Sequence, residues 1–257
     1  MYKEKRAEQI FQTIQENGDA SVEELAQKFH VSAMTIRRDL AFLEKSGVIN
    51  RTHGGAISVS SLPLEELYET KQTQNYAMKQ QIAQKTIDLI KNLPSINSIF
   101  LDAGTTTYQI ALLIKQQFQD LTIFTNDLKI ASELFDSSHT VFICGGRIQK
   151  ETGCVVGQQS DAFVKNLNMD LCVLGVQSIN SKLYLTASLE EKAINKQKIL
   201  ASSATKILAC DKSKFNGNGI FTIASVTDFH YVITDYTFLP EHLSQLERSG
   251  TSVIPMA

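Results

Sequence analysis

The 257-residue sequence predicts a small N-terminal unit of three helices and a hairpin, followed by a larger α/β unit with a mainly parallel sheet. Three observations predict this organisation. Apolar residues repeat at helical spacing in three short segments before residue 46. Two strand-like runs then flank a pair of glycines. Beyond residue 97, short apolar runs rich in β-branched residues alternate with helix-length stretches, as in a parallel sheet covered by helices.

Composition and charge exclude several classes of protein. Apolar residues make up 43% of the chain, and 25 Lys and Arg stand against 27 Asp and Glu. No apolar run approaches the roughly 20 residues of a membrane helix, and the charged N-terminus is unlike a signal peptide. Four cysteines without Cys-x-x-Cys spacing predict reduced core residues and no metal site. We therefore expect a soluble cytoplasmic protein without a membrane partner.

The first two helices are delimited by capping signals. The first apolar stripe runs from Ala7 to Ile14 and stops at Asn17-Gly18. Ser21 begins a capping box, Ser-Val-Glu-Glu, ahead of the second stripe. The connection 30–33 leads into a third helix, for which Ser32 is the natural N-cap. Two short helices joined in this way predict a helix-turn-helix over about residues 20–39.

The third helix has an apolar face and an outward face. Ile36, Leu40 and Leu43 share the face that must pack on the first two helices. The N-terminal end of the outward face is the part of a recognition helix that meets base edges in the major groove. A solvated arginine pair is the alternative, but the complete unit favours DNA contacts. The predicted DNA-contacting residues here are Ser32, Met34, Thr35, Arg37 and Arg38.

A hairpin follows this helix. Residues 48–51 and 56–59 are predicted as short strands, and Thr52-His-Gly-Gly joins them. A hairpin at this place is the wing of a winged helix-turn-helix. Arg51 and His53 are expected to reach backbone phosphates from it.

These residues carry a resemblance to a known family. The run Val-Ser-Ala-Met-Thr-Ile-Arg-Arg-Asp-Leu-Ala-Phe-Leu-Glu at 31–44, followed by Gly-Val-Ile-Asn-Arg-Thr-His-Gly-Gly-Ala at 47–56, closely resembles the N-terminal signature of DeoR/GlpR-type bacterial repressors of sugar metabolism. The resemblance implies DNA binding with Arg37 and Arg38 in the groove. The angular positions of these two residues point to the same face independently.

The chain after the hairpin is divided by composition. A DNA-binding domain is predicted at 1–58, a linker at 59–72, and an α/β effector-binding and oligomerisation domain at 73–257. Parallel strands are expected at 98–102, 121–125, 140–144, 170–176, 206–211 and 231–234, with helices at 106–119, 128–135 and 189–203. An apolar stripe between Ile82 and Leu93 fits either a core-facing helix or a dimer contact.

Polar residues gather at four strand ends, where ligands of parallel sheets bind. The first strand closes with Asp-Ala-Gly-Thr-Thr-Thr at 102–107, whose amides and hydroxyls can hold an anion at a helix start. A plain helix cap is the alternative for the threonines, but four polar ends on one rim favour an anion pocket. The predicted pocket residues are Asp102, Gly104, Thr105, Thr106, Thr107, Thr125, Asn126, Gly145, Gly146 and Lys214.

The resemblance extends to this second segment. Asp-x-Gly-Thr-Thr, Thr-Asn, Gly-Gly and Asp-x-Ser-Lys-Phe occur in the order found in the effector domain of the same repressors. That domain resembles ribose-5-phosphate isomerase and its CoA transferase-like relatives, and the resemblance implies a bound phosphorylated sugar. One stretch departs from the pattern: Gln177 or Asn180 stands where the family has an acid, and Leu183-Tyr184 where it has a glycine.

Three functions were compared. A sugar-phosphate isomerase with a DNA-binding appendage needs a positioned base. The acid is missing near Gln177, and Glu190 and Glu191, beside Lys192, fit a solvated face. An architectural DNA binder would not need a large domain with an anion pocket. The sequence therefore predicts a non-enzymatic repressor of a carbohydrate operon, with operator DNA, a phosphorylated sugar and further copies of itself, a dimer or tetramer, as partners and no cofactor.

Overall fold

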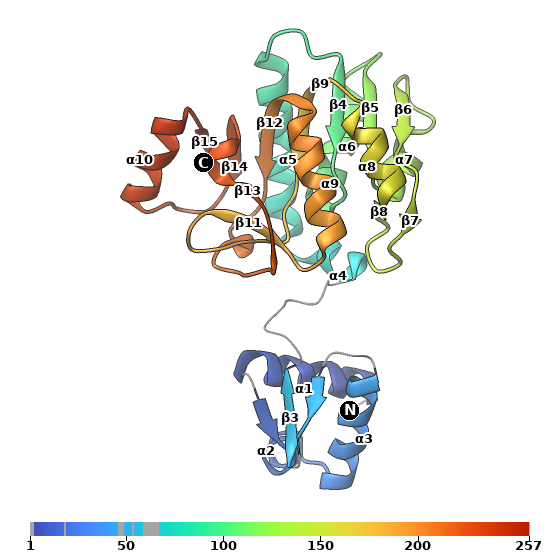
Figure 1. The fold of residues 1–257 in the computed structure, drawn as a ribbon, viewed down its shortest axis with the longest axis vertical. Coiled ribbons are helices and arrows are strands. Elements are labelled where there is room, and N and C mark those ends of the chain that lie inside the picture. Colours follow the sequence, from blue (N-terminus) through green and yellow to red (C-terminus); the bar gives the residue numbers. More distant parts are fainter. Residues whose placement is uncertain (1–2, 18, 46–48, 53, 59–66, 257) are drawn as a thin grey trace. The chain divides into compact units, whose positions relative to one another are not determined.

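The computed structural model describes residues 3–17, 19–45, 49–52, 54–58 and 67–256. The chain divides into two compact units, Met1–Leu64 and Glu65–Ala257 (Figure 1). Among the described residues, no helix is long and apolar enough to cross a membrane. His53 and residues 59–66 of the predicted linker lie outside the described residues.

The N-terminal unit contains the predicted helices and hairpin. Its elements are α1 (Lys3–Asn17), β1 (Asp19–Ser21), α2 (Val22–Phe29), α3 (Ala33–Lys45), β2 (Ile49–Arg51) and β3 (Gly55–Ser58). The three strands form an antiparallel sheet in the order β1-β3-β2. The strand β1 was not predicted, because its three residues, Asp-Ala-Ser, are too few to show an alternating pattern.

Local capping signals and the apolar stripes explain this unit. The Ser21 side chain accepts a hydrogen bond from the Glu24 amide at 3.1 Å, and Glu24 accepts one from the Ser21 amide at 2.9 Å, which confirms the capping box. Ile36, Leu40 and Leu43 of α3 are buried with Ile10 and Ile14 of α1, as the helical periodicity predicts.

The second unit is built on a seven-stranded sheet in which every pairing is parallel. The order is β15-β14-β12-β9-β4-β5-β6. All six predicted strands lie in it, and β15 was not predicted. The strands are β4 (Ser98–Leu101), β5 (Thr122–Thr125), β6 (Thr140–Ile143), β9 (Met169–Leu174), β12 (Ser203–Ala209), β14 (Tyr231–Thr234) and β15 (Ser252–Pro255).

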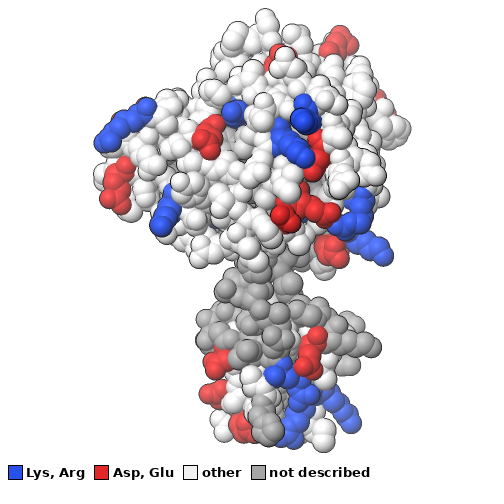
Figure 2. All heavy atoms as spheres, viewed as in Figure 1, with Lys and Arg blue, Asp and Glu red and all other residues white. Residues whose placement is uncertain are grey.

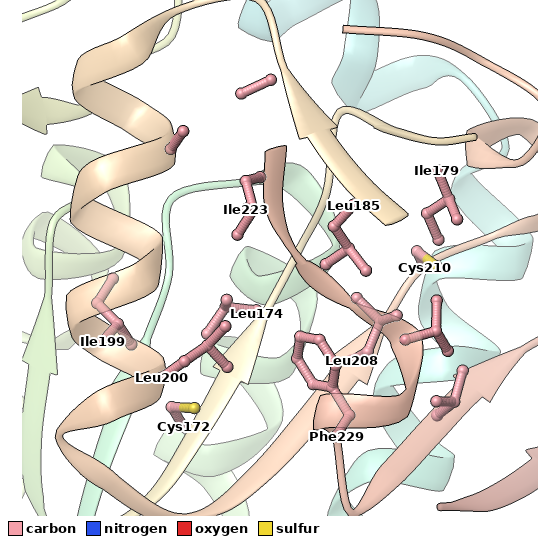
Figure 3. Packing of buried hydrophobic residues seen from close by; sticks show 14 of the residues in the cluster. Cys172, Leu174, Ile179, Leu185, Ile199, Leu200, Leu208, Cys210, Ile223 and Phe229 are labelled. Atoms are coloured by element: carbon pink, nitrogen blue, oxygen red, sulfur yellow. The ribbon is translucent and has the colours of Figure 1, made fainter. Parts of the chain in front are cut away.

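Different elements cover the two faces of this sheet (Figure 1). The helices α5 (Tyr76–Asn92), α6 (Thr105–Gln117) and α7 (Leu128–Leu134) form one core with it. The other face packs against α8 (Gln158–Lys165), α9 (Glu190–Ala201), α10 (Pro240–Ser249) and a small antiparallel sheet of β10 (Ser178–Ile179), β11 (Tyr184–Ala187) and β13 (Phe221–Ser225). Figure 3 shows this second core, with Ile199 and Leu200 of α9 beside Leu174 and Leu208 of the sheet.

The second unit has several further short elements. They are the hairpin β7 (Arg147–Ile148) and β8 (Val155–Val156), and the 3-10 turns η1 (Lys212–Lys214) and η2 (Val226–Asp228). Cys144, Cys154, Cys172 and Cys210 are all buried and unpaired, as expected for reduced core residues. Burial raises the pKa of the Cys144 thiol to about 11, so that thiol stays protonated.

One predicted boundary needs correction. Residues 68–72, assigned to the linker from composition, form most of a helix, α4 (Tyr68–Thr73). The Tyr68 side chain is 5% exposed, and its amide donates to the Glu151 carbonyl at 2.8 Å. These contacts attach α4 to the rest of the second unit, so that unit begins before residue 73.

The direction in which the chain adds strands to the sheet reverses between β4 and β9, although these two strands are themselves parallel. From β4 the chain proceeds through β5 to β6 on one side, and from β9 through β12, β14 and β15 on the other. Connections leave β4 and β9 in opposite directions, which opens a crevice at their carboxyl ends. Asp102 follows β4 and Gly175 follows β9, so this crevice is where a ligand of such a sheet binds.

Candidate functional site

The outward face of α3 is polar and basic. Ser32, Arg37 and Arg38 are exposed, and Thr35 is half-buried. Met34 is exposed over 58% of its surface. Figure 2 shows Lys and Arg side chains gathered on the α3 side of this unit. The start of this helix, where DNA contacts were predicted, is therefore exposed on the surface of the unit.

Asp39, on the buried side of α3, fixes the orientation of this helix. Its carboxylate is buried and accepts from Arg6 of α1, at 2.6 Å from Nε and 3.3 Å from Nη2. This two-bond contact fixes α3 against α1 immediately after the two outward arginines. Ser32 acts as the predicted N-cap, because its Oγ accepts from the Thr35 amide at 3.2 Å.

The hairpin offers one further basic side chain. Arg51 is exposed at the end of β2, where it pairs with Ala56 of β3. The Thr52 amide donates to the Gly55 carbonyl at 3.0 Å, which closes the turn. The prediction for His53 falls outside the described residues.

The second unit contains a cavity of about 80 Å³ at the crevice between β4 and β9. The loop Ala103–Thr106 and the loop Gly175–Gln177 form two of its sides. Lysine side chains from three other segments complete it: Lys71 of α4, Lys192 and Lys196 of α9, and Lys214 of η1. Among the described residues, no carboxylate lines this cavity. Its chemistry is that of an anion site.

Asn126 and Asp127 shape the loop that follows β4. Asn126 Oδ1 accepts from the Ala103 amide at 2.7 Å, and Asp127 Oδ2 accepts from the Gly104 amide at 3.1 Å. Those two amides are therefore engaged within the protein. The amides of Thr105 and Thr106 belong to the first turn of α6, where helical amides have no intrahelical acceptor. They are the backbone groups of this loop that an anion can reach.

Asp102 and Lys196 form a buried ion pair beside the cavity. The Lys196 ammonium contacts the Asp102 carboxylate and also donates to the Gly175 carbonyl at 2.9 Å. Asp102 Oδ2 accepts from the Gly175 amide at 3.3 Å. The pair thus joins the carboxyl ends of β4 and β9. A smaller adjoining cavity of about 20 Å³ is lined by Asp102, Asn126, Lys192 and Lys196, among others.

The structure separates the predicted pocket residues into three groups. Gly104, Thr105, Thr106 and Lys214 line the main cavity, and Asp102 and Asn126 line the adjoining one. Thr107 and Thr125 are fully buried and donate to the carbonyls of Gly104 at 2.8 Å and Leu101 at 2.7 Å. These two threonines stabilise the loop and the strand end.

Gly145 and Gly146 lie on the exposed connection after β6 and line neither of these two cavities. Gly146 has a φ of +144°, and a Cβ there would lie 2.5 Å from the Val156 carbonyl oxygen. The close approach of the β7–β8 hairpin therefore accounts for a glycine at this position.

Three lysines of the cavity were missed. Lys192 was assigned to a solvated face with Glu190 and Glu191; both glutamates are exposed, but Lys192 lines the cavity. Lys192 and Lys196 are four residues apart, so they share one face of α9. This four-residue spacing was the feature of the sequence from which a shared position of the two lysines could have been predicted. Lys71 carried no signal, because only the packing of α4 brings it to the cavity.

The stretch that departs from the family pattern forms the rim of the cavity. Gln177 lines it, and its Oε1 accepts from the Ser188 amide and hydroxyl at 3.1 and 3.0 Å. Asn180 Oδ1 accepts from the Lys182 and Tyr184 amides, both at 3.0 Å, and closes the turn. Leu183 has a φ of +62°, so the backbone keeps the left-handed conformation that favours glycine.

Burial raises the pKa of two groups near the cavity. Burial raises the pKa of the Cys210 thiol, which lines the cavity, so no thiolate opposes an anion there. Burial also raises the pKa of Asp127 to about 6, against the lowering effect of its amide bonds. Within the described residues, no group of three or more His, Cys, Asp or Glu could hold a metal ion.

The comparisons with known proteins cover both units. Residues 6–62 match the DeoR-like helix-turn-helix domain, and residues 74–236 match the DeoR C terminal sensor domain. The chain is 31% identical over 249 residues to the HTH-type transcriptional regulator GlpR of Haloferax volcanii, covering 97% of this chain and 96% of the relative. It is 30% identical over 246 residues to the glycerol-3-phosphate regulon repressor of Escherichia coli, covering 93% of this chain and 96% of the relative.

A solved structure with a similar arrangement is ribose 5-phosphate isomerase A from Neisseria gonorrhoeae. It has a TM-score of 0.40 and 13% identity, and the match covers 56% of this chain and 55% of that chain. The family matches, by contrast, place a DNA-binding unit and a sensor unit at the two regions where the structure has an outward basic helix and a cationic cavity. The chain is thus a member of the DeoR family of transcriptional regulators.

Proposed function

We propose that this protein represses a carbohydrate-utilisation operon and that a phosphorylated sugar bound in the second unit controls the repression. The observation that carries the proposal is the cavity at the β4–β9 crevice. Four lysines and the first turn of α6 surround it, and no described carboxylate lines it. A phosphate dianion gains from both the ammonium groups and the positive end of the helix. A relative named for the glycerol-3-phosphate regulon supports a small phosphorylated ligand.

The DNA half of the proposal rests on α3. Arg37 and Arg38 would enter the major groove, and Arg51 would contact a phosphate from the hairpin. Selection from a randomised DNA pool would supply the preferred operator. A gel shift of that operator, titrated with a panel of sugar phosphates and the matching free sugars, tests the whole proposal. Release by a phosphorylated sugar alone is expected; no response to any member would contradict it.

We propose that the second unit is not an enzyme. An isomerase of this kind needs a carboxylate positioned to move a proton between adjacent carbons. Asp102, the carboxylate beside the cavity, is buried and engaged by Lys196 and by the Gly175 amide. Incubation with ribose 5-phosphate should yield no ketose phosphate above the uncatalysed rate. Turnover would favour the enzymatic alternative. The proposal includes no cofactor beyond the effector.

We also propose that the protein acts as a homo-oligomer through strand β6, because one winged helix contacts too little DNA for strong specificity. Among the described strands, β6 pairs only with β5. Phe142 and Ile143 are 43% and 42% exposed, although neighbouring strand residues point to opposite faces. The opposite edge, β15, ends in Pro255, a residue that discourages pairing.

The charges around β6 suit a second copy of this chain. A two-fold interface uses the same patch on both copies, so every charge buried in it needs a partner within that patch. Lys115 pairs with Glu133 and Asp136 at 3.1 and 2.7 Å, and Arg147 pairs with Glu191.

Finally, we propose a cytoplasmic location, which fits four buried unpaired thiols.

A further inference from the structure

The helix α4 begins the second unit and also contributes a lysine to the anion cavity. It is the first helix of that unit, directly after the residues that join it to the DNA-binding unit. Its Lys71 lines the anion cavity together with Thr105 and Lys214. Of the four lysines that line the cavity, Lys71 alone lies on an element next to the connection. Along the chain, α4 is therefore the described element of the second unit that comes first after the DNA-binding unit.

The C-terminal end of α4 is held by polar contacts to buried groups. Lys79 of α5 is 2% exposed; its ammonium contacts the Lys71 carbonyl and donates to the Gln74 carbonyl at 2.7 Å. A buried ammonium needs such acceptors, and the last carbonyls of a helix supply them. Asn75 Nδ2 donates to Asp211 Oδ1 at 3.0 Å, and Asp211 caps the turn that carries Lys214. The backbone beneath Lys71 is thus tied to the turn beneath Lys214.

The N-terminal end of α4 packs on the helix that starts at the anion loop. The Tyr68 ring meets the Tyr108 ring of α6 edge-on, with centroids 6.5 Å apart. Lys129 of α7 lies over the Tyr68 ring, 4.2 Å from its centroid. Tyr68 therefore rests on the two helices whose first residues, Thr105 and Leu128, flank the loop at Gly104 and Asp127.

Some buried polar atoms near α4 have no hydrogen-bond partner. In the described part of the chain, three buried side-chain atoms have no hydrogen-bond partner: Tyr68 Oη, Asp211 Oδ2 and His242 Nδ1. One of the three, Tyr68 Oη, belongs to α4, and a second, Asp211 Oδ2, belongs to the carboxylate that binds Asn75, two residues beyond the end of this helix. Buried polar groups are nearly always bonded, so each such atom weakens the arrangement that contains it.

We propose that α4 is the element through which effector binding is reported to the DNA-binding unit. An anion in the cavity binds more tightly when the Lys71 ammonium lines that cavity. It therefore stabilises the observed position of α4 relative to positions in which Lys71 is farther from the cavity. A ligand shifts an equilibrium by the difference in its affinity for the two states, and Lys71 supplies that difference. The inference rests on the proposed anion site but goes beyond it, because it assigns to Lys71 the contact that couples a bound anion to the position of α4.

Hydrogen exchange of the full chain, with glycerol 3-phosphate and inorganic phosphate as probes, tests this. In the wild type, both the start of α6 and α4 should exchange more slowly when probe is added. In Lys71→Met, the start of α6 should still be protected, at higher probe concentration, while protection of α4 is lost. Lys165→Met removes one exposed charge on α8 and should behave as the wild type.

The outcomes separate the two proposals. Protection of α6 without α4 in the wild type, or α4 protection that survives in Lys71→Met, would overturn the role of α4 and leave the anion site standing. Protection of neither segment by either probe would overturn both. A second variant needs no probe: Tyr68→Phe removes an unsatisfied hydroxyl and should slow exchange of α4 by itself. Exchange equal to that of Tyr76→Phe, a control at an exposed position of the next helix, would also count against the proposal.

Discussion

Lys196 donates to Asp102 at a point where 10% of the lysine side chain and 1% of the carboxylate are exposed. The contact joins α9 to the end of β4, and the amide of Gly175, which follows β9, donates to the same carboxylate. One buried pair therefore fixes the relative positions of the three elements that bound the cavity.

Removal of the lysine alone should be costly. Lys196→Met leaves a buried carboxylate without its cation, and such losses destabilise proteins by about 3–5 kcal/mol. The double variant Asp102→Asn with Lys196→Met removes both charges and should recover most of that loss. Thermal unfolding of the full chain measures both effects. Equal unfolding temperatures for the single and double variants would contradict a coupled pair.

The two predicted kinds of DNA contact should be distinguishable. Arg38→Ala should relax sequence preference at one base pair by about 1–3 kcal/mol. Arg51→Ala should weaken binding to all sequences alike and reduce the dependence of affinity on salt. Titration of the selected operator and its single-base variants at several salt concentrations measures both. Equal, sequence-independent losses would mean that the groove assignment of Arg38 is wrong.

The anion loop can be tested with charge. Thr105→Asp adds a negative charge at the first turn of α6, which the helix dipole tolerates but a bound phosphate does not. The variant should keep operator binding and lose the effector response, while Lys214→Met should only weaken the response. Gln116→Glu, on an exposed position of the same helix, is the control. A full response in both pocket variants would place the phosphate elsewhere.

The β6 edge predicts a change in assembly. Phe142→Lys puts a charge on an edge strand, a feature that prevents pairing between strands. The variant should elute as a monomer where the wild type elutes as a dimer or larger, with correspondingly weaker operator binding. Ile220→Lys, at another exposed apolar position, should not change the size. A monomeric wild type that still binds its operator tightly would contradict the oligomer proposal.

Asp127 predicts a pH dependence of stability. Its folded pKa of about 6 lies above the ordinary value of 3.8, so the folded state binds this proton more tightly than the unfolded chain. The group therefore contributes stability that is complete below the unfolded pKa and is lost as pH rises through about 6. At about 1.4 kcal/mol per pKa unit, the loss is at most a few kcal/mol.

Comparison of unfolding temperatures between pH 4 and 7 checks the sign. Relative to Asp127→Asn, the wild type should lose stability as pH increases over this range. The variant cannot supply an acceptor to both Gly104 and the start of α7, so only the slope of the difference is diagnostic. A difference that is constant with pH would contradict the raised pKa.

The sequence predicts those features that depend on local interactions. The capping box at Ser21 and the loop at Gly104 involve residues within four positions of one another, so their patterns are visible in the chain. Lys71, Lys196 and Lys214 meet because β4 and β9 are neighbours, which only the assembled sheet determines. Thr125 was assigned to the pocket because a strand-end hydroxyl looks the same in sequence whether it faces ligand or backbone.

Part of the cavity rim belongs to the small sheet of β10, β11 and β13, whereas the lysines come from helices and turns outside it. The turn at 180–184 closes on itself through Asn180, so substitutions between Gln177 and Ala187 would leave the buried ion pair untouched. Ile179, Leu183 and Leu185 of this segment belong to the hydrophobic core, whereas the Gln177 side chain lines the cavity. Replacement of Gln177 would therefore change the wall of the cavity and leave all four of its lysines in place.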